Sequence, residues 1–159
     1  MSQKYETKLK QLNLPGFSFK IIGEDNKREI FDPVRKKYVR LTPEEWVRQN
    51  FIQYLIQNGS YPSGLIGIEV MFRLNTLARR VDILVHNRSG APVMIIECKA
   101  PDVTIDDKVF DQIVCYNMKF KLPYLIVTNG IDHYACKIDN TNNTYEFLNV
   151  IPLYEDLLV

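Results

Sequence analysis

The order of helical and extended segments predicts an α/β fold, in which helices flank a mixed central sheet in the order α-β-β-β-α-β-β. Three observations predict it. A capped helix precedes three closely spaced strands, a second amphipathic helix follows them, and two further strands come after it. With 159 residues, of which 46% are hydrophobic and 25% charged, the chain can bury one core, so we expect a single globular domain.

The N-terminal region is polar and is expected to form an arm over residues 1–27. A Pro-Gly pair interrupts this arm, and the residues after it, 17–22, favour a short strand. A hairpin is predicted over residues 29–41, with its turn near Asp32. The main domain is therefore expected to span residues 28–159.

A strong helix start follows the hairpin. Thr42 is a good N-cap, Pro43 suits the first helical position, and Glu44 and Glu45 place negative charge in the first turn. The helix is expected to end near Gln57, because an Asn-Gly pair follows.

Three strands come next, over residues 67–74, 80–86 and 93–99. The last two are separated by Asn-Arg-Ser-Gly at 87–90, a sequence typical of a tight turn. These strands should therefore form an antiparallel meander.

The second helix is predicted over residues 106–121, where apolar residues follow a helical stripe, and Pro123 ends it. An almost wholly apolar strand follows at 124–128 and a final strand at 133–138. The segment 127–130 between them is interpreted as the closing turn of a hairpin.

Charged residues occur where strands are otherwise apolar. Asp82 lies within the second strand of the meander, and Glu97 and Lys99 lie at the end of the third. Alternate strand residues share a face, so Glu97 and Lys99 point the same way and Cys98 points the other way. Reflection about the turn puts Asp82 opposite residues 96–98. One face would then hold two carboxylates and an ammonium.

This set of groups suits magnesium, with manganese as a substitute, because hard divalent ions take carboxylate oxygens and keep several waters. In phosphodiester cleavage the ion would polarise the phosphate and activate a water, while Lys99 would orient that water or stabilise developing negative charge. The alternative is that Asp82, Glu97 and Lys99 form a paired or solvated charge cluster at a sheet edge.

The same residues carry a family resemblance. Asp82, fourteen intervening residues and then Glu97-Cys98-Lys99 resemble the D…(D/E)XK signature of the PD-(D/E)XK restriction-endonuclease-like superfamily. Gln112 and Tyr116, four residues apart on one helical face, resemble the QxxxY motif of recombination nucleases and type I restriction enzyme R subunits.

The chain is most similar to the N-terminal nuclease-domain family of the type I restriction enzyme R subunit. The resemblance covers roughly residues 28–140 and rests on five ordered segments, at residues 41–50, 80–83, 96–101, 111–117 and 127–130. It implies a restriction-endonuclease-like core, with Asp82 and Glu97 on the metal and Lys99 beside the attacking water. It also implies that Gln112 and Tyr116 lie near DNA or support the site.

A glutamate of the first helix often completes such a metal site. Glu44 and Glu45 are both candidates, and either could instead only favour the helix N-terminus. Glu69 on the first meander strand is a reserve candidate. Arg79 and Arg80 precede Asp82 and are expected to contact DNA phosphates. A second basic group has the same possible role or is simply solvated: Arg35, Lys36, Lys37 and Arg40.

These features predict a magnesium-dependent DNA endonuclease of restriction or repair type. The sequence has no GxxxxGK[ST] phosphate loop, so we expect no motor of its own. The alternative is a non-catalytic nucleic-acid-binding or assembly module, and RNA stays open as a substrate. Expected partners are duplex or branched DNA, restriction or motor subunits, and a second copy of the chain.

The formal net charge of +1 neither supports nor excludes a nucleic-acid partner. No apolar run approaches the roughly 20 residues of a membrane span, so a soluble cytoplasmic protein without a membrane partner is expected. Cys98, Cys115 and Cys136 lack metal-ligand spacing and are expected to be buried thiols.

Overall fold

The computed structural model describes residues 8–157, so the first part of the expected arm, residues 1–7, lies outside the described residues. A six-stranded sheet has the order β4-β5-β6-β7-β8-β9, and a small sheet has the order β1-β2-β3. The strands are β1 (Ile21–Ile22), β2 (Glu29–Asp32), β3 (Lys37–Arg40), β4 (Ile66–Leu74), β5 (Leu77–His86), β6 (Pro92–Cys98), β7 (Tyr124–Thr128), β8 (His133–Asp139) and β9 (Thr144–Leu148). The helices are α1 (Pro43–Gln57) and α2 (Asp107–Met118).

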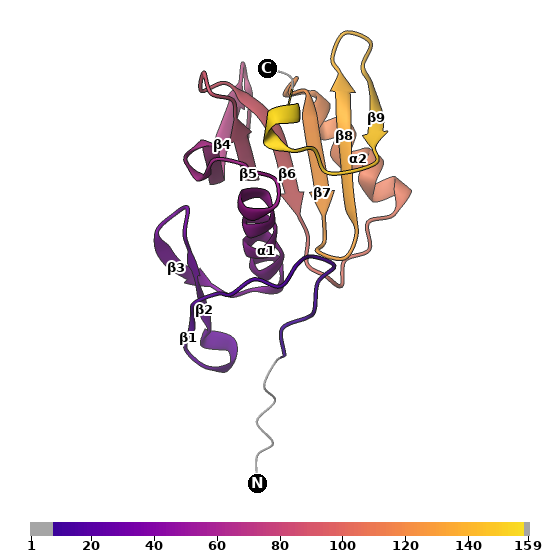
Figure 1. The fold of residues 1–159 in the computed structure, drawn as a ribbon. Coiled ribbons are helices and arrows are strands. Elements are labelled where there is room, and N and C mark those ends of the chain that lie inside the picture. Colours follow the sequence, from indigo (N-terminus) through magenta and orange to yellow (C-terminus); the bar gives the residue numbers. More distant parts are fainter. Residues whose placement is uncertain (1–7, 158–159) are drawn as a thin grey trace.

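Helix α1 lies between the small sheet and the six-stranded sheet, and α2 covers the other face of the six-stranded sheet (Figure 1). Helix α1 begins as predicted, because the Thr42 hydroxyl accepts a hydrogen bond of 3.1 Å from the Glu45 amide. Val47, Phe51 and Leu55 are fully buried against the sheet. The predicted α/β class, with a mixed sheet between helices, is confirmed.

The sheet is antiparallel except for one parallel pair, β6 and β7, which α2 connects. In the β5–β6 hairpin Ile83 lies opposite Ile96, so Asp82 is brought opposite Glu97. The predicted register is confirmed. It is the step that brings two acids, distant in sequence, to one level of the sheet.

The turn between β7 and β8 is built from side chains as well as backbone. Asn129 Oδ1 accepts hydrogen bonds from the amides of Ile131 and Asp132, at 2.9 and 2.8 Å. Gly130 has a φ of +84°, a left-handed conformation that favours glycine. This segment closes a hairpin, as interpreted from the sequence.

Three sequence-based expectations differ from the structure. The expected strand over 17–22 is only Ile21–Ile22, and a last strand, Thr144–Leu148, was not predicted at all. Strand β9 lies at the edge of the sheet and owes its conformation to pairing with β8, which local sequence does not reveal.

The third difference concerns the cysteines. Cys98 and Cys136 are buried as expected, but the expectation was wrong for Cys115, which lies exposed on α2. Within residues 8–157, no helix has the length and apolar character needed to cross a membrane.

Candidate active site

Asp82 and Glu97 lie on adjacent strands, and a backbone amide orients Asp82. Asp82 Oδ2 accepts a hydrogen bond of 2.8 Å from the Cys98 amide. The Glu97 carboxylate is nearly buried, with 7% of its side chain exposed. The amide of Lys99 donates to the Thr128 carbonyl at 2.8 Å, so β7 holds the chain in place just beyond β6. The two acids and the lysine are thus brought to one end of β6.

Electrostatic interactions show that four charged groups of this region affect one another. The pKa of Glu97 is raised to about 7, chiefly by burial and also by the negative charge of Asp82, while the positive charges of Arg79 and Lys99 oppose the rise. Burial and the Asp82 charge also raise the pKa of Glu44, whereas Arg48 and Lys99 lower it. Glu44, Asp82, Glu97 and Lys99 therefore share one electrostatic environment.

The two glutamates at the start of α1 have different surroundings. Glu44 is 45% exposed at its side chain and approaches Arg48, with Oε1 3.3 Å from a guanidinium nitrogen. Glu45 is buried and has three partners: it pairs with Arg48, with Arg35 at 2.6 Å, and accepts a hydrogen bond of 2.9 Å from Gln49. Only Glu44 therefore has a carboxylate that is open to solvent beside Asp82.

A buried ionic network supports these acids from behind. Arg48 donates to Asp82 Oδ1 at 2.8 Å and pairs with Glu45, while only 4% of its side chain is exposed. Arg35 pairs with Asp32 and Glu45, and its third partner is Glu69 at 2.9 Å. The network joins the β2–β3 hairpin to α1 and to the central sheet.

Asp32 anchors the far end of this network. Burial by itself raises the pKa of Asp32, but hydrogen bonds from the Arg35 backbone, the Arg35 side chain and Gln49 outweigh burial, so the pKa is lowered. Arg35 therefore points inward and is not a member of an exposed phosphate-binding group. Lys36, Lys37 and Arg40 from the same basic run remain on the surface.

The reserve candidate Glu69 lies in β4 beside Asp82 and has a left-handed φ of 50° within a strand. This conformation costs roughly 1–2 kcal/mol for a residue with a side chain. It accompanies ion pairs from Glu69 Oε2 to Arg35 and Arg80, each 2.9 Å long. The Glu69 carboxylate is thus paired with two arginines. One of them, Arg80, is 64% exposed and contacts Glu69 from the surface.

Arg79 connects the candidate site with α2. Its guanidinium pairs with Glu97, donates to Asn117 Oδ1 at 3.3 Å, and lies 4.9 Å from the centre of the Tyr116 ring. Gln112 and Tyr116 line a cavity of about 380 Å³ on α2. Glu97, Lys99 and Arg79 line the same cavity. The structure thus brings together the residues of the two predicted motifs, D…(D/E)XK and QxxxY.

Sequence reasoning missed Arg48 and Asn117. Both are buried, whereas arginine and asparagine are usually exposed, so residue type alone gives no reason to place them at the site. The spacing of Arg48, one turn after Glu44, was a usable signal for an ion pair on α1. Nothing local marks Asn117 as a partner of Arg79.

The donor chemistry of the site fits a hard divalent cation. In residues 8–157 no group of three His, Cys, Asp or Glu side chains is arranged as ligands of one ion. Magnesium, however, often takes only one or two protein carboxylates and keeps its waters. Asp82 and Glu97 supply such carboxylates, and in this structure the Arg79 guanidinium pairs with Oε1 of the buried Glu97. Asp82 and Glu97 are therefore chemically suitable as the one or two protein ligands of magnesium.

The raised pKa of Glu97 predicts a pH dependence of stability in EDTA. Because the folded protein binds a proton at Glu97 more tightly than the unfolded chain, the free energy of unfolding should fall as the pH rises from about 5 to about 7. Urea unfolding of wild type and Glu97→Gln at both pH values measures this. The variant, neutral throughout, should lack this fall and be the more stable protein above pH 7. Parallel pH profiles for the two proteins would contradict the prediction.

Comparison with known proteins identifies the family. A family model described as the type I restriction enzyme R protein N terminus matches residues 43–152, from the start of α1 to beyond β9. Among solved structures, a fragment of a candidate HsdR subunit of a type I restriction enzyme from Vibrio vulnificus YJ016 is 17% identical, with a TM-score of 0.49. The likeness covers 74% of this chain and 24% of that chain, so this chain spans about a quarter of its length. No curated protein matches the chain. Because the family model matches more than half of the residues, the chain belongs to the family of type I restriction enzyme R protein N-terminal regions.

Proposed function

We propose that this chain is a magnesium-dependent DNA endonuclease module of a restriction system, which hydrolyses phosphodiester bonds and has no motor of its own. The convergence of Asp82, Glu97 and Lys99 at the end of β6 carries the proposal. Its family supports a restriction-related nuclease. Motor and specificity subunits are proposed partners for the same reason.

Each residue has a separate proposed role. Asp82 and Glu97 hold the ion, and Glu44 rather than Glu45 completes the site because its carboxylate is the accessible one. When bound, magnesium would polarise the scissile phosphate and lower the pKa of a coordinated water. The Cys98 amide fixes the orientation of Asp82 through its 2.8 Å hydrogen bond.

The remaining groups act on the substrate. The Lys99 ammonium lines the cavity beside Glu97, where it orients the attacking water and stabilises negative charge that develops on the phosphate. Arg79 is held by Glu97 and Tyr116 and would turn to a DNA phosphate when the ion takes over Glu97. Gln112 lines the same cavity and is a proposed DNA contact.

A second candidate function has one observation in its favour. Arg48 and Arg79 neutralise the two central carboxylates, Asp82 and Glu97, as they would in a site that never holds an ion. A non-catalytic DNA-binding or assembly module could keep the fold with this pairing. The accessible Glu44 and Lys99, whose ammonium forms no ion pair within residues 8–157, favour the nuclease, because simple binding requires neither.

The test is cleavage by the purified chain of supercoiled plasmid, linear duplex, single strands and branched DNA, with magnesium, manganese or EDTA. We expect cleavage with either metal, none in EDTA, and none by Asp82→Ala. Asp132→Ala, which removes an exposed acid outside the site, is the matched control and should cleave as wild type. DNA binding that persists in Asp82→Ala, with no cleavage by wild type under any condition, would support the second candidate.

A further inference from the structure

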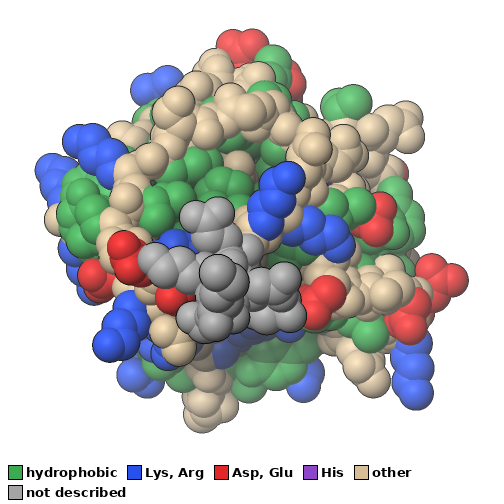
Figure 2. Space-filling model, turned by 90° about the horizontal axis from the view of Figure 1, so that it is seen from below, with side chains coloured by type: hydrophobic (Ala, Val, Ile, Leu, Met, Phe, Trp, Pro, Cys, Tyr) green, Lys and Arg blue, Asp and Glu red, His purple; other side chains and the backbone are tan. Residues whose placement is uncertain are grey.

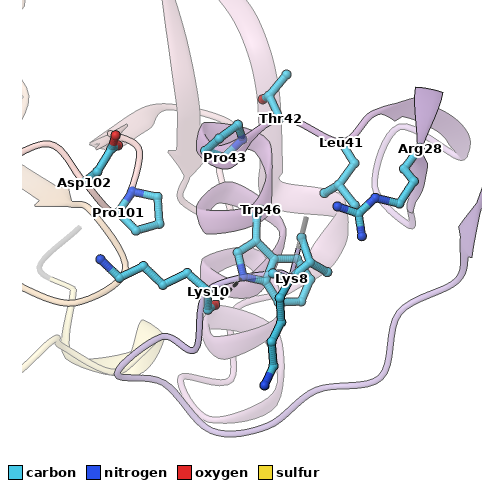
Figure 3. A pocket seen from close by; sticks show the side chains of 10 residues that line it. Lys8, Lys10, Arg28, Leu41, Thr42, Pro43, Trp46, Pro101 and Asp102 are labelled. Atoms are coloured by element: carbon cyan, nitrogen blue, oxygen red, sulfur yellow. Dashed lines mark hydrogen bonds between the residues drawn. The ribbon is translucent and has the colours of Figure 1, made fainter. Parts of the chain in front are cut away.

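A second cavity lies beside the start of α1 and belongs to neither predicted motif. Its volume is about 200 Å³, and Figure 3 shows the Trp46 indole at its centre, with Pro101 and Asp102 on one side and Leu41 and Arg28 on the other. The full lining is Lys8, Leu9, Lys10, Arg28, Leu41, Thr42, Pro43, Trp46, Pro101 and Asp102.

Two residues that line this cavity are close in sequence to proposed active-site residues. Pro43 precedes Glu44 in the first turn of α1, and Pro101 follows Lys99 by two residues at the end of β6. The cavity is therefore lined by the same chain segments that carry Glu44 and Lys99.

The Trp46 ring lines the cavity, packs edge-to-face with Phe19, and has its polar edge already satisfied. Its Nε1 donates a hydrogen bond of 2.9 Å to the Lys10 carbonyl. The N-terminal segment is held there, because the Asn13 amide donates to the Gly130 carbonyl at 2.8 Å. Leu41 and Pro43 add further apolar surface. Such a surface suits a flat, unsaturated ring.

The rim carries the opposite kind of chemistry. Lys8, Lys10 and Arg28 bring three positive charges to the lining, against one negative charge from Asp102. In Figure 3 the Lys10 side chain extends toward Pro101, and Arg28 lies on the opposite side of the indole. Figure 2 looks at this end of the molecule, where Lys and Arg side chains lie beside exposed hydrophobic ones. An aromatic floor with a basic rim complements a base that carries a phosphate.

We propose that this cavity binds one unpaired nucleotide of the DNA substrate, with its base on Trp46 and its phosphate near Lys10 and Arg28. The inference rests on the proposed function and specifies its substrate as DNA with an unpaired or opened base near the cleaved bond. At about 200 Å³ the cavity is smaller than the roughly 300–1,000 Å³ of sites for drug-sized ligands, so it suits a single base. A base inside a duplex is stacked and paired and cannot enter it.

Trp46 is the only tryptophan of the chain, so its fluorescence reports on this cavity alone. The full chain is titrated in EDTA, where no cleavage occurs, with a short oligothymidylate, a duplex of equal length, an abasic strand of equal charge, and thymidine monophosphate. We expect saturable quenching by the oligothymidylate, and little or none by the duplex or the abasic strand. The mononucleotide should need a much higher concentration, because it lacks the phosphate contacts of a strand.

Variants separate stacking from charge. Trp46→Leu should weaken binding of a dye-labelled oligothymidylate, measured by anisotropy, by roughly 5- to 150-fold. Lys10→Gln and Arg28→Gln leave the indole in place and should each reduce the slope of log affinity against log salt by about one. Lys137→Gln on β8 is the matched control, which removes a cation outside the cavity lining and should change neither quantity.

Several results would overturn the proposal: equal quenching by the abasic strand or the duplex, no quenching at all, or saturation by the mononucleotide at the concentration required by the strand. The cleavage assay separates this failure from failure of the proposed function. Metal-dependent cleavage with unchanged Trp46 fluorescence rejects the nucleotide site alone. Quenching without cleavage under any condition rejects the nuclease and retains the nucleotide site.

Discussion

Replacement of Lys99 by methionine is expected to lower the rate of magnesium-dependent DNA cleavage by roughly 10²–10³-fold, the typical loss when one stabilising donor is removed from an active site. Methionine keeps most of the apolar length of the side chain but cannot carry a charge. The backbone amide of residue 99 would still donate to the Thr128 carbonyl, so the end of β6 should keep its place. The loss should therefore appear in the rate of cleavage and not in folding.

Single-turnover cleavage, with the protein in saturating excess over the DNA, measures this effect, and circular dichroism verifies the fold. Lys119→Met is the matched control, because Lys119 lies 5.5 Å from the centre of the Tyr116 ring, near the same cavity. It removes an equal charge without removing a proposed catalytic group, and its rate should stay within roughly tenfold of wild type. Equal losses in both variants would show that Lys99 contributes only general positive charge.

Replacement of Arg48 by methionine is expected to destabilise the protein by about 3–5 kcal/mol, the cost of leaving buried charge without its partner. Arg48 contacts Glu45 and Asp82 and is almost fully buried, so the substitution would leave two carboxylates facing each other across its place. For a domain of this size, the melting temperature should fall by roughly 6–20 °C. Arg48→Lys should recover part of the loss, because one ammonium can satisfy only some of these partners.

Arg80→Met is the control for this stability experiment. Arg80 also pairs with an acid of the network, Glu69 at 2.9 Å, but its side chain is 64% exposed. An exposed pair contributes about 0–1 kcal/mol, so the melting temperature of this variant should change little. Urea unfolding of the three variants beside wild type measures the differences in free energy of unfolding, and thermal unfolding measures the differences in melting temperature. An Arg48→Met protein as stable as wild type would show that the network does not hold α1 against the sheet.

The comparison of Arg48 and Arg80 also shows where prediction from sequence stops. Both are arginines near acids, and the chain offers no local reason to bury one and expose the other. The small sheet decides it, because β2 and β3 cover the side of α1 that carries Glu45, Arg48 and Gln49. Charged and amide side chains are usually exposed, whereas Asp32 and Arg35 of the hairpin enclose this side of the helix.

The site divides in the same way. The pairing of Asp82 with Glu97 and the shared face of Gln112 and Tyr116 were predictable, because strand alternation, a short hairpin turn and helical spacing are local properties. The pairing of Arg79 with Tyr116 was not, since it joins β5 to α2 across a long stretch of chain. Residues close in sequence determine the placements of Asp82 with Glu97 and of Gln112 with Tyr116. The contact of Arg79 with Tyr116 is determined only by how distant segments pack.

The amino-acid sequence by itself determined the helices, all but the last strand of the main sheet, and the register that brings Asp82 to Glu97. Capping residues, apolar periodicity and a tight turn act over a few residues and need no tertiary context. Tertiary structure alone decided that Glu44 stays exposed within the electrostatic influence of Asp82, that Arg48 and Arg79 neutralise the central acids, and that β9 forms. These outcomes depend on which charges are removed from water together, and that follows only from how the two sheets and α1 pack.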